Sequence, residues 1–338
     1  MIPFCDLSRQ AEALAADYAN AFERVMRSGR FLFGPECEAL EAELAAWHGV
    51  KHCVCVASGT DAIEIALRAQ GIHSKSLYTS TMTAPATPNA IEASGNVPWF
   101  KDIDPRTRNA TGCDVQVHIY GLAELADTAK VEDCAHAMGA WVNGKLAGTM
   151  GRCGALSFYP TKILGAMGDG GAVLTDSELV AHDARSIRHY GRNEMGNITL
   201  RGQNSRMSEV QAALLRVSLT HVDDWIARRR KIAERYSAEL HGKVVTPWTP
   251  AGCEPVYHVY VIESEQRDEL AEGLYTCHGI DTMQHYPRPI HAHARWNDQP
   301  DRYPHADALA KRCLSLPCYP YLTDSEQTKV INAVKELT

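Results

Sequence analysis

The residue best suited to chemistry is Lys162, which ends the segment SFYPTK (157–162) and precedes the glycine-rich run GAMGDGG (165–171). Upstream, Asp133 lies in the segment EDCAHAMG (132–139). A lysine that forms a Schiff base and an acid that pairs with a pyridinium nitrogen are the groups with which proteins use pyridoxal phosphate (PLP). A lysine alone would be weak support, because most lysines are solvated surface charges. Together and in this order, the two residues predict a PLP site.

Ser58, Gly59 and Thr60 form a candidate phosphate site. They stand between a predicted strand, 52–57, and a helix that begins near Asp61. The N–H groups at a helix N-terminus bind phosphate well, and a glycine lets the chain approach closely. The alternative is an ordinary helix cap, for which serine and threonine are common. The presence of Asp133 and Lys162 favours phosphate binding.

Asp133 ends a predicted strand, and ligand sites of α/β sheets gather at such ends. A buried carboxylate beside a pyridinium keeps the ring nitrogen protonated. The alternative is a surface acid, a role that suits the adjacent Glu132 better. A partly desolvated lysine beside positive charge has a lowered pKa, which suits Lys162 to act as a base as well. The glycine-rich run matches no dinucleotide fingerprint and is interpreted as a tight turn.

The elements that must position these residues alternate between short apolar runs and helical patterns, which favours an α/β domain with a mainly parallel sheet. A helix is expected over 208–222, and Trp225, Ile232, Tyr236 and Leu240 fall on one face of a second helix. We place a domain change within that helix, which gives a large domain, 1–230, and a small one, 231–338. A closing helix is expected over 324–337. Strands are predicted at 52–57, 76–80, 97–101, 115–120, 130–133, 155–158, 172–175 and 256–262.

Composition narrows the function classes. The 338 residues are 45% hydrophobic with a formal net charge of −7, so a general nucleic-acid footprint is not expected. The run RRRK (228–231) is interpreted as a solvated helix face rather than a nucleic-acid patch. No apolar run is long enough for a membrane helix, and no secretory signal is recognised. The eleven cysteines form no C-x-x-C pair, and Cys53 and Cys55 alternate as in a strand, which predicts a reduced, cytoplasmic protein.

Motifs along nearly the whole chain resemble the DegT/DnrJ/EryC1/StrS family of sugar aminotransferases. The resemblance implies the aspartate-aminotransferase fold (fold type I of PLP enzymes): α/β, with a large domain around a mainly parallel mixed sheet and a smaller C-terminal α+β domain. It also implies a homodimer with shared active sites. Besides the Asp133 and Lys162 segments, the motifs are IPFCDL (2–7), SGRFLFGP (28–35), SGTDA (58–62), NSR (204–206), QAAL (211–214), HYP (285–287) and LP (316–317).

The resemblance implies a role for each site residue. Lys162 carries the PLP and later moves a proton, Asp133 sets the electronics of the ring, and His136 contacts the phenolic oxygen of the cofactor or packs near it. Arg206 binds the amino donor or forms a structural salt bridge. His118, Tyr120, His285 and Tyr286 are expected near the substrate. The phosphate is expected to be held by Ser58, Gly59, Thr60, Ser157 and Asn204 of the partner subunit.

The implied reaction transfers an amino group from glutamate to a nucleotide-linked ketosugar. The contexts of Trp225 and Tyr286 favour C3 of a dTDP-3-keto-6-deoxyhexose over C4. The alternatives are the same chemistry at C4 of a ketosugar or on an aminocyclitol, or, in another class, a catalytically idle sensor or regulator. The intact Lys162 disfavours that last alternative. No metal is expected: His285, His291 and His293 have no nearby cysteine or carboxylate cluster.

Two departures from the family pattern are visible. The stretch 105–131 is too short for its usual helices, so one helix is expected to be reduced to a turn or a short helix. Ala84 stands where relatives carry an aromatic ring that stacks on the cofactor. We expect either weaker cofactor retention or another side chain over the ring, with Met82 and Tyr120 as candidates.

Overall fold

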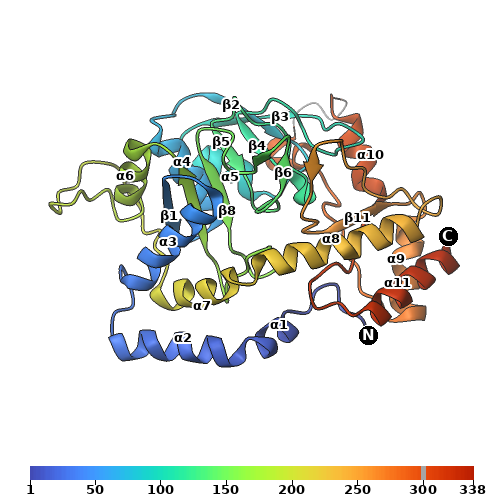
Figure 1. Cartoon of the computed structure of the whole chain (residues 1–338). Coiled ribbons are helices and arrows are strands. Elements are labelled where there is room, and N and C mark those ends of the chain that lie inside the picture. The colour runs from blue at the N-terminus through green and yellow to red at the C-terminus, as the bar shows by residue number, and fades with distance from the viewer. Residues whose placement is uncertain (298–301) are drawn as a thin grey trace.

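A five-stranded mixed sheet forms the centre of the N-terminal part of the chain (Figure 1). The computed structural model describes residues 1–297 and 302–338. Strands β4, β5 and β8 run parallel, whereas β9 is antiparallel to both of its neighbours. Asp133 on β5 is in register with Ala155 on β8, the strand that carries Ser157. The order across the sheet is β1 (His52–Val56), β9 (Gly171–Thr175), β8 (Gly154–Ser157), β5 (Val131–Asp133) and β4 (Val115–Val117).

Two further parallel strands, β2 (Ser76–Ser80) and β3 (Val97–Lys101), lie beyond β4. The hydroxyl of Thr79 on β2 donates to the carbonyl oxygen of Val115 on β4 at 3.0 Å. The β2–β3 pair therefore lies beside β4 as a separate two-stranded sheet, without a regular ladder to it. The mainly parallel mixed sheet predicted from the sequence is confirmed.

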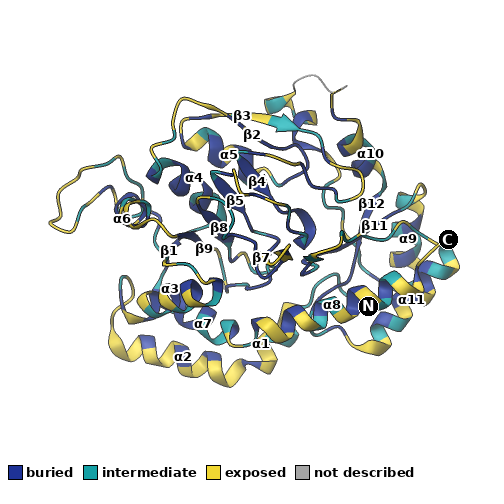
Figure 2. Cartoon of the chain, turned by 45° about the horizontal axis from the view of Figure 1, so that its top comes forward, coloured by how far each residue is buried: buried dark blue, intermediate teal, exposed yellow. Residues whose placement is uncertain are grey.

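Helices cover both faces of the sheet. Cys53 and Cys55 of β1 pack on the side of α3 and α7, whereas Val54 and Val56 pack on the side of α4, α5 and α6. This packing on opposite faces explains the alternation of cysteine and valine seen in the sequence of β1. All eleven cysteines are free. In Figure 2 the central strands are dark with buried residues, and the outer surface of α2 is exposed. The helices are α2 (Ala15–Ser28), α3 (Pro35–His48), α4 (Gly59–Ala69), α5 (Ala86–Ala93), α6 (Glu178–Ile187) and α7 (Glu209–Leu219).

The helix α8 (Val222–Glu239) leads from the sheet to the C-terminal part of the chain (Figure 1). Its residues Val222 and Ile226 pack in the core beside the sheet, whereas Ile232 and Tyr236 pack in a separate C-terminal core. The division into 1–230 and 231–338 stays a prediction, and this change of core along α8 supports it. The C-terminal elements are the antiparallel pair β11 (Tyr260–Glu263) and β12 (Cys313–Leu316), with α9 (Arg267–His278), α10 (Pro304–Arg312) and α11 (Asp324–Leu337).

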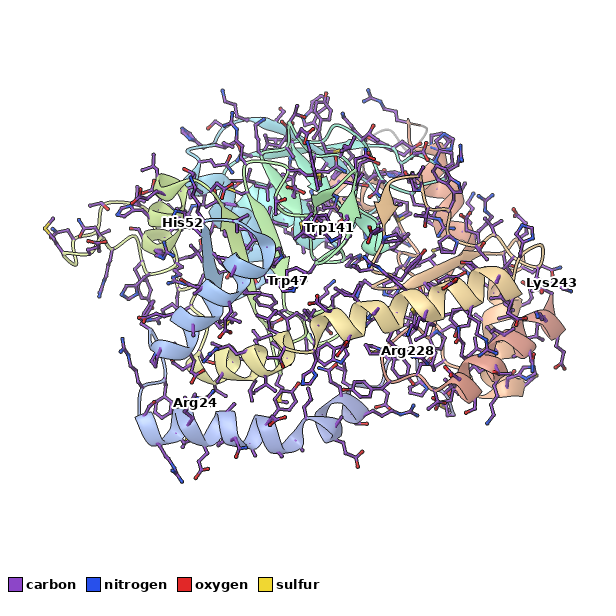
Figure 3. The ribbon with its side chains drawn as sticks, in the orientation of Figure 1. Arg24, Trp47, His52, Trp141, Arg228 and Lys243 are labelled. Carbon is purple, nitrogen blue, oxygen red and sulfur yellow. The ribbon has the colours of Figure 1, made fainter. Side chains whose placement is uncertain are left out.

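The basic run on α8 is only partly the solvated face expected from the sequence: Lys231 is exposed, Arg228 and Arg230 are half-buried, and Arg229 is buried. Arg229 is only 4% exposed and donates to the carbonyl oxygens of His258 and Cys318. Arg228 donates to Asp324 at 2.8 Å, at the start of α11 (Figure 3). These guanidinium groups fasten the helix to the C-terminal part, because buried donors must find acceptors.

The remaining elements are short. The connection between β4 and β5 contains only the 3₁₀ turn η1 (Ile119–Gly121), which confirms the expected loss of a helix there. Strand β4 ends at Val117 and β11 begins at Tyr260, so the predicted strands at 115–120 and 256–262 were too long. No helix among the described residues is long and apolar enough to cross a membrane. The others are α1 (Leu7–Ala13), β6 (Trp141–Val142), β7 (Lys145–Leu146), β10 (Cys253–Glu254), η2 (Ile290–Ala292) and η3 (Ala294–Trp296).

Candidate active site

A cavity of about 260 Å³ lies where the parallel strands β4, β5 and β8 end and α4 begins. It brings together nine of the residues singled out in the sequence, from segments far apart in the chain. Tyr120, His285, Asn204 and Arg206 are not among the residues that line it. The nine are Ser58, Gly59, Thr60, His118, Asp133, His136, Ser157, Lys162 and Tyr286.

One end of the cavity is the N-terminus of α4. The Ser58 hydroxyl accepts the N–H of Asp61 at 3.1 Å, so this side chain caps the helix, as the alternative interpretation held. The first N–H groups of a helix have no partner within it, and here they belong to Gly59 and Thr60. A Cβ on Gly59 would lie 2.6 Å from the Cβ of Ser157, so only glycine lets the start of α4 approach the end of β8 this closely. The end of the cavity is therefore built for an anion.

Asp133 forms the acidic wall of the cavity and is only 7% exposed. Its Oδ1 accepts the N–H of Ala135 at 3.1 Å, and its Oδ2 accepts the hydroxyl of Thr87 at 2.7 Å. Each carboxylate oxygen can accept more than one hydrogen bond. The group is therefore held in place and still has lone pairs for a further donor.

The adjacent Glu132 is not a surface acid, and that expectation was wrong. It is fully buried, and it accepts the N–H groups of Gly148, Met150 and Gly151 at 2.7–2.8 Å. It also accepts Nε2–H of His118 at 2.9 Å, while Nδ1 of His118 accepts the N–H of Glu124. Because a buried carboxylate needs hydrogen-bond donors, Glu132 fixes the loop 148–151 to the end of β5.

His118, Glu132 and Cys134 are also the one group of three possible metal ligands within residues 1–297 and 302–338. Hydrogen bonds already account for both ring nitrogens of His118 and for both oxygens of Glu132. Burial also raises the pKa of the Cys134 thiol, which disfavours the thiolate that a metal would need. His118 and Glu132 therefore form a structural hydrogen-bond network rather than a metal site. His118 contributes only to the wall of the cavity.

Lys162 faces Asp133 across the cavity. Burial lowers the pKa of its amine from 10.5 to about 8, and the charge of Asp133 opposes this shift. Half of the amine is therefore neutral at pH 8. A neutral amine is both a nucleophile and a base, whereas an ammonium group is neither.

His136 is fixed by its neighbours. Nδ1 accepts the N–H of Tyr120 at 3.3 Å, which leaves the proton of the neutral ring on Nε2. Nε2 lies 3.4 Å from the Tyr286 hydroxyl, and the ring packs 4.5 Å from that of His258. Burial and the nearby Lys162 hold the pKa of His136 well below its usual range. This histidine therefore presents a neutral N–H donor.

Tyr120 and His285 stand one layer behind the cavity. The Tyr120 hydroxyl donates to the His285 carbonyl oxygen, and Nδ1 of His285 contacts the Ser315 hydroxyl at 2.8 Å. Burial and Lys162 lower the pKa of His285 to about 4. Within this geometry the two residues support the wall next to Tyr286.

Asn204 and Arg206 do not line the cavity and lie on the segment between α6 and α7. Part of this segment projects from the body beside α6, at the left of Figure 1. Nε of Arg206 donates to Oδ1 of Asn204 at 2.9 Å, and the guanidinium lies 5.4 Å from the centre of the Tyr190 ring. The same segment exposes Met195 and Ile198 at 82% and 72%.

Ala84 lines the cavity, beside Ala86 and Thr83. Neither Met82 nor Tyr120, the two side chains expected to cover the cofactor ring, lines the cavity. Met82 is fully buried in another core cluster, and Tyr120 lies behind the wall. The aromatic side chains that line the cavity are Tyr159 and Tyr286.

We expect Ala84→Phe to bind PLP roughly two- to tenfold more tightly than the parent chain, because a stacked ring contributes about 0.5–1.5 kcal/mol beyond its buried area. Ala84→Leu adds bulk without a π-face and is the matched control. Titration of the cofactor-free proteins with PLP gives the dissociation constants. Unchanged or weaker binding with the fold intact would mean that Ala84 does not face the ring, or that its place is already filled.

Sequence reasoning missed five residues of this region. Tyr159, Asp169 and Thr83 line the cavity, His258 packs against His136, and Thr87 donates to Asp133 from behind. Only the threonines could have been found from the sequence, because Thr83 and Thr87 are four residues apart and stand next to Ala84, the residue that departs from the family pattern. The three histidines of 285–293 do not gather: His291 is buried and contacts Thr81 at 2.7 Å.

The group implied by these residues is PLP, and the donor set fits it. A helix N-terminus suits the phosphate, Asp133 suits a protonated ring nitrogen, and the lowered pKa of Lys162 suits a covalent link to an aldehyde. Fold and cavity together define a PLP-dependent enzyme of the aspartate-aminotransferase fold.

Comparisons with known proteins identify the family. Residues 12–335 match the DegT/DnrJ/EryC1/StrS aminotransferase family. The chain belongs to this family and is a PLP-dependent aminotransferase. It is 38% identical to the dTDP-3-amino-3,4,6-trideoxy-alpha-D-glucose transaminase of Streptomyces venezuelae, over 99% of this chain and 96% of the relative. That alignment spans 367 positions, so the relative has residues that the 338-residue chain lacks.

Two solved structures extend the comparison. The structure of DesV from S. venezuelae superposes with a TM-score of 0.95 at 35% identity, covering 99% of this chain and 98% of that one. The structure of ntda from Bacillus subtilis has the bound cofactor PMP. It superposes with a TM-score of 0.88 at 25% identity, over 99% of this chain and 85% of that one. The fold type predicted from the sequence is thereby confirmed.

Proposed function

We propose that this aminotransferase moves an amino group from glutamate to a nucleotide-linked ketosugar, and that its acceptor is a dTDP-3-keto-6-deoxyhexose aminated at C3. The observation that carries the proposal is the near full-length similarity to a transaminase named for a dTDP-3-amino sugar. Amination at C4, or of an aminocyclitol, is the alternative for the acceptor.

The proposed roles follow from the cavity. Backbone N–H groups of Gly59 and Thr60, with the Ser157 hydroxyl, hold the phosphate. Asp133 would pair with the ring nitrogen, and His136, which lines the same cavity, would lie beside the ring. Lys162 carries the cofactor. His118 is assigned to the wall, because both of its ring nitrogens are engaged.

When bound, PLP supplies a ring that withdraws electrons from a substrate carbon as a proton leaves it. The chain supplies the rest. The Asp133 carboxylate would lie opposite the ring nitrogen and favour its protonated form. Once free of the cofactor, the neutral amine of Lys162 can take a proton from the substrate carbon and return it at another, and its pKa of about 8 allows both states near neutral pH. The neutral rings of His136 and His285 add no positive charge beside it.

An absorbance scan tests the function. The purified, PLP-loaded protein should be yellow, and glutamate alone should bleach it. A dTDP-3-keto-6-deoxyhexose should then restore the colour and give one aminated sugar for each glutamate consumed. A 4-keto isomer is the matched acceptor control. Bleaching without restoration by either sugar would contradict the acceptor, and no bleaching by glutamate would contradict the donor.

We further propose a homodimer in which Asn204 of the partner subunit completes each phosphate site. Asn204 is exposed and does not line the cavity of its own chain. The exposed Met195 and Ile198 nearby are large apolar side chains that a partner would cover. Arg206 stays assigned to the amino donor or to a structural contact, since its guanidinium lies between aromatic rings.

Mixed dimers test this sharing. Lys162→Ala and Asn204→Asp chains are each expected to lose activity as homodimers, the second because a carboxylate would repel the phosphate. If sites are shared, a heterodimer of the two variants has one intact site, with Lys162 from one chain and Asn204 from the other, and should show about half of the parent activity. Two purification tags isolate the heterodimer. An inactive heterodimer with normal assembly, or a fully active monomer at low concentration, would refute the sharing.

A further inference from the structure

Two buried threonines form a chain of hydrogen bonds to Asp133, one from the wall of the cavity (Thr83) and one from behind it (Thr87). Thr87 lies in the first turn of α5 and is fully buried, and Thr83, in the loop before the helix, is 3% exposed. The hydroxyl of Thr87 donates to Oδ2 of Asp133 at 2.7 Å, and its oxygen lies 3.0 Å from that of Thr83. Buried hydroxyls need partners, and these two find them in one another and in the carboxylate.

The direction of this chain of hydrogen bonds follows from the chemistry of the groups. An ionised carboxylate only accepts hydrogen bonds, so the single proton of the Thr87 hydroxyl is directed to Asp133. The Thr83 hydroxyl must then be the donor between the two threonines. Each donor polarises the next bond, which strengthens the series Thr83 to Thr87 to Asp133.

The placement is not what helix geometry alone would produce. A threonine in a helix often bonds the carbonyl oxygen four residues earlier. Thr87 instead contacts the side chain of the residue four positions back and reaches across to β5. Between the two threonines, Ala84 and Ala86 line the cavity. One short segment thus forms the wall of the cavity and supports the carboxylate from behind.

We propose that Thr87, backed by Thr83, is a positioning residue that orients the Asp133 carboxylate toward the ring nitrogen of PLP. The inference rests on the role proposed above for Asp133. With Oδ1 held by the N–H of Ala135 and Oδ2 held by Thr87, the plane of the carboxylate is fixed from two sides. Preorganisation of this kind matters most for groups that meet a charged partner in a dry site.

The test compares PLP with 1-deazapyridoxal phosphate, in which C–H replaces the ring nitrogen. Thr87→Val keeps the shape and removes the hydroxyl. It should weaken PLP binding by the cofactor-free, full-length protein roughly tenfold to a hundredfold, because hydrogen bonds to charged groups are the strong ones. Binding of the deaza analogue should change less than twofold. Thr83→Val should weaken PLP binding severalfold, and Thr87→Ser should restore it.

Thr175→Val is the matched control, since Thr175 is equally buried and donates to the Arg152 carbonyl oxygen at 3.2 Å, away from the cavity. It should leave the affinities for both cofactors unchanged. An equal loss of both affinities in Thr87→Val would make the residue merely structural and overturn the proposal. Unchanged PLP affinity in Thr87→Val would also overturn it. Should the parent chain fail to prefer PLP over the deaza analogue, the role of Asp133 itself would be wrong.

Discussion

Lys162→Ala should lose both the visible absorbance of bound PLP and all measurable turnover, because no other amine lines the cavity described here. Lys145→Ala is the control, since Lys145 is half exposed and pairs with Asp127 at 2.6 Å on the surface. Borohydride reduction followed by mass analysis locates the attached cofactor. Cofactor trapped on the Lys162→Ala chain would contradict the assignment.

The pKa of Lys162 adds a second readout to this prediction. Burial lowers that pKa from 10.5 to about 8, so the neutral amine becomes populated at lower pH than on an exposed lysine. The rate at which the cofactor-free parent chain captures PLP should therefore rise with pH and level off above a midpoint near 8. A midpoint near 10.5 would mean that the amine is not desolvated.

Asp133→Asn should retain some PLP, through Lys162, but lower turnover roughly a hundredfold or more, because without the counter-charge the buried ring nitrogen loses its proton and the ring withdraws electrons less strongly. A PLP derivative methylated at the ring nitrogen carries a permanent positive charge and should recover part of the lost rate. Asp127→Asn, at an exposed ion pair, is the control. Parent-like turnover of Asp133→Asn with PLP itself, or no gain in turnover with the methylated cofactor, would exclude the proposed electronic role.

The residues that line the cavity were largely predictable, because the chemistry restricts their types. A Schiff base needs a lysine, a pyridinium needs an acid, and a phosphate needs a helix N-terminus with a close-approach glycine. Each signal is local, and the strands that carry Asp133 and Ser157 were visible as apolar runs. The shortened connection before β5 was also predictable from its length alone.

What could not be predicted depends on which elements become neighbours. The sequence gives no sign that α5 packs behind the end of β5, so the link from Thr87 to Asp133 is visible only in three dimensions. For the same reason Glu132 looked like a surface acid, although three N–H groups from a distant loop surround it. The run at 228–231 was partly misjudged because its acceptors lie on the C-terminal part of the chain.

The short turn η1 limits motion between the part of the chain that contains the sheet and the C-terminal part. Gly121, at its end, has φ +102°, and a Cβ there would lie 2.8 Å from the backbone nitrogen of His258. The sheet and the C-terminal part therefore touch backbone to backbone, and they also share a core in which Val117 and Ile119 pack with Val259 and Val261. A hinge between them would expose these side chains at about 1.5–3 kcal/mol each. We expect the two parts to move as one body, with substrate admitted by loops rather than by domain closure.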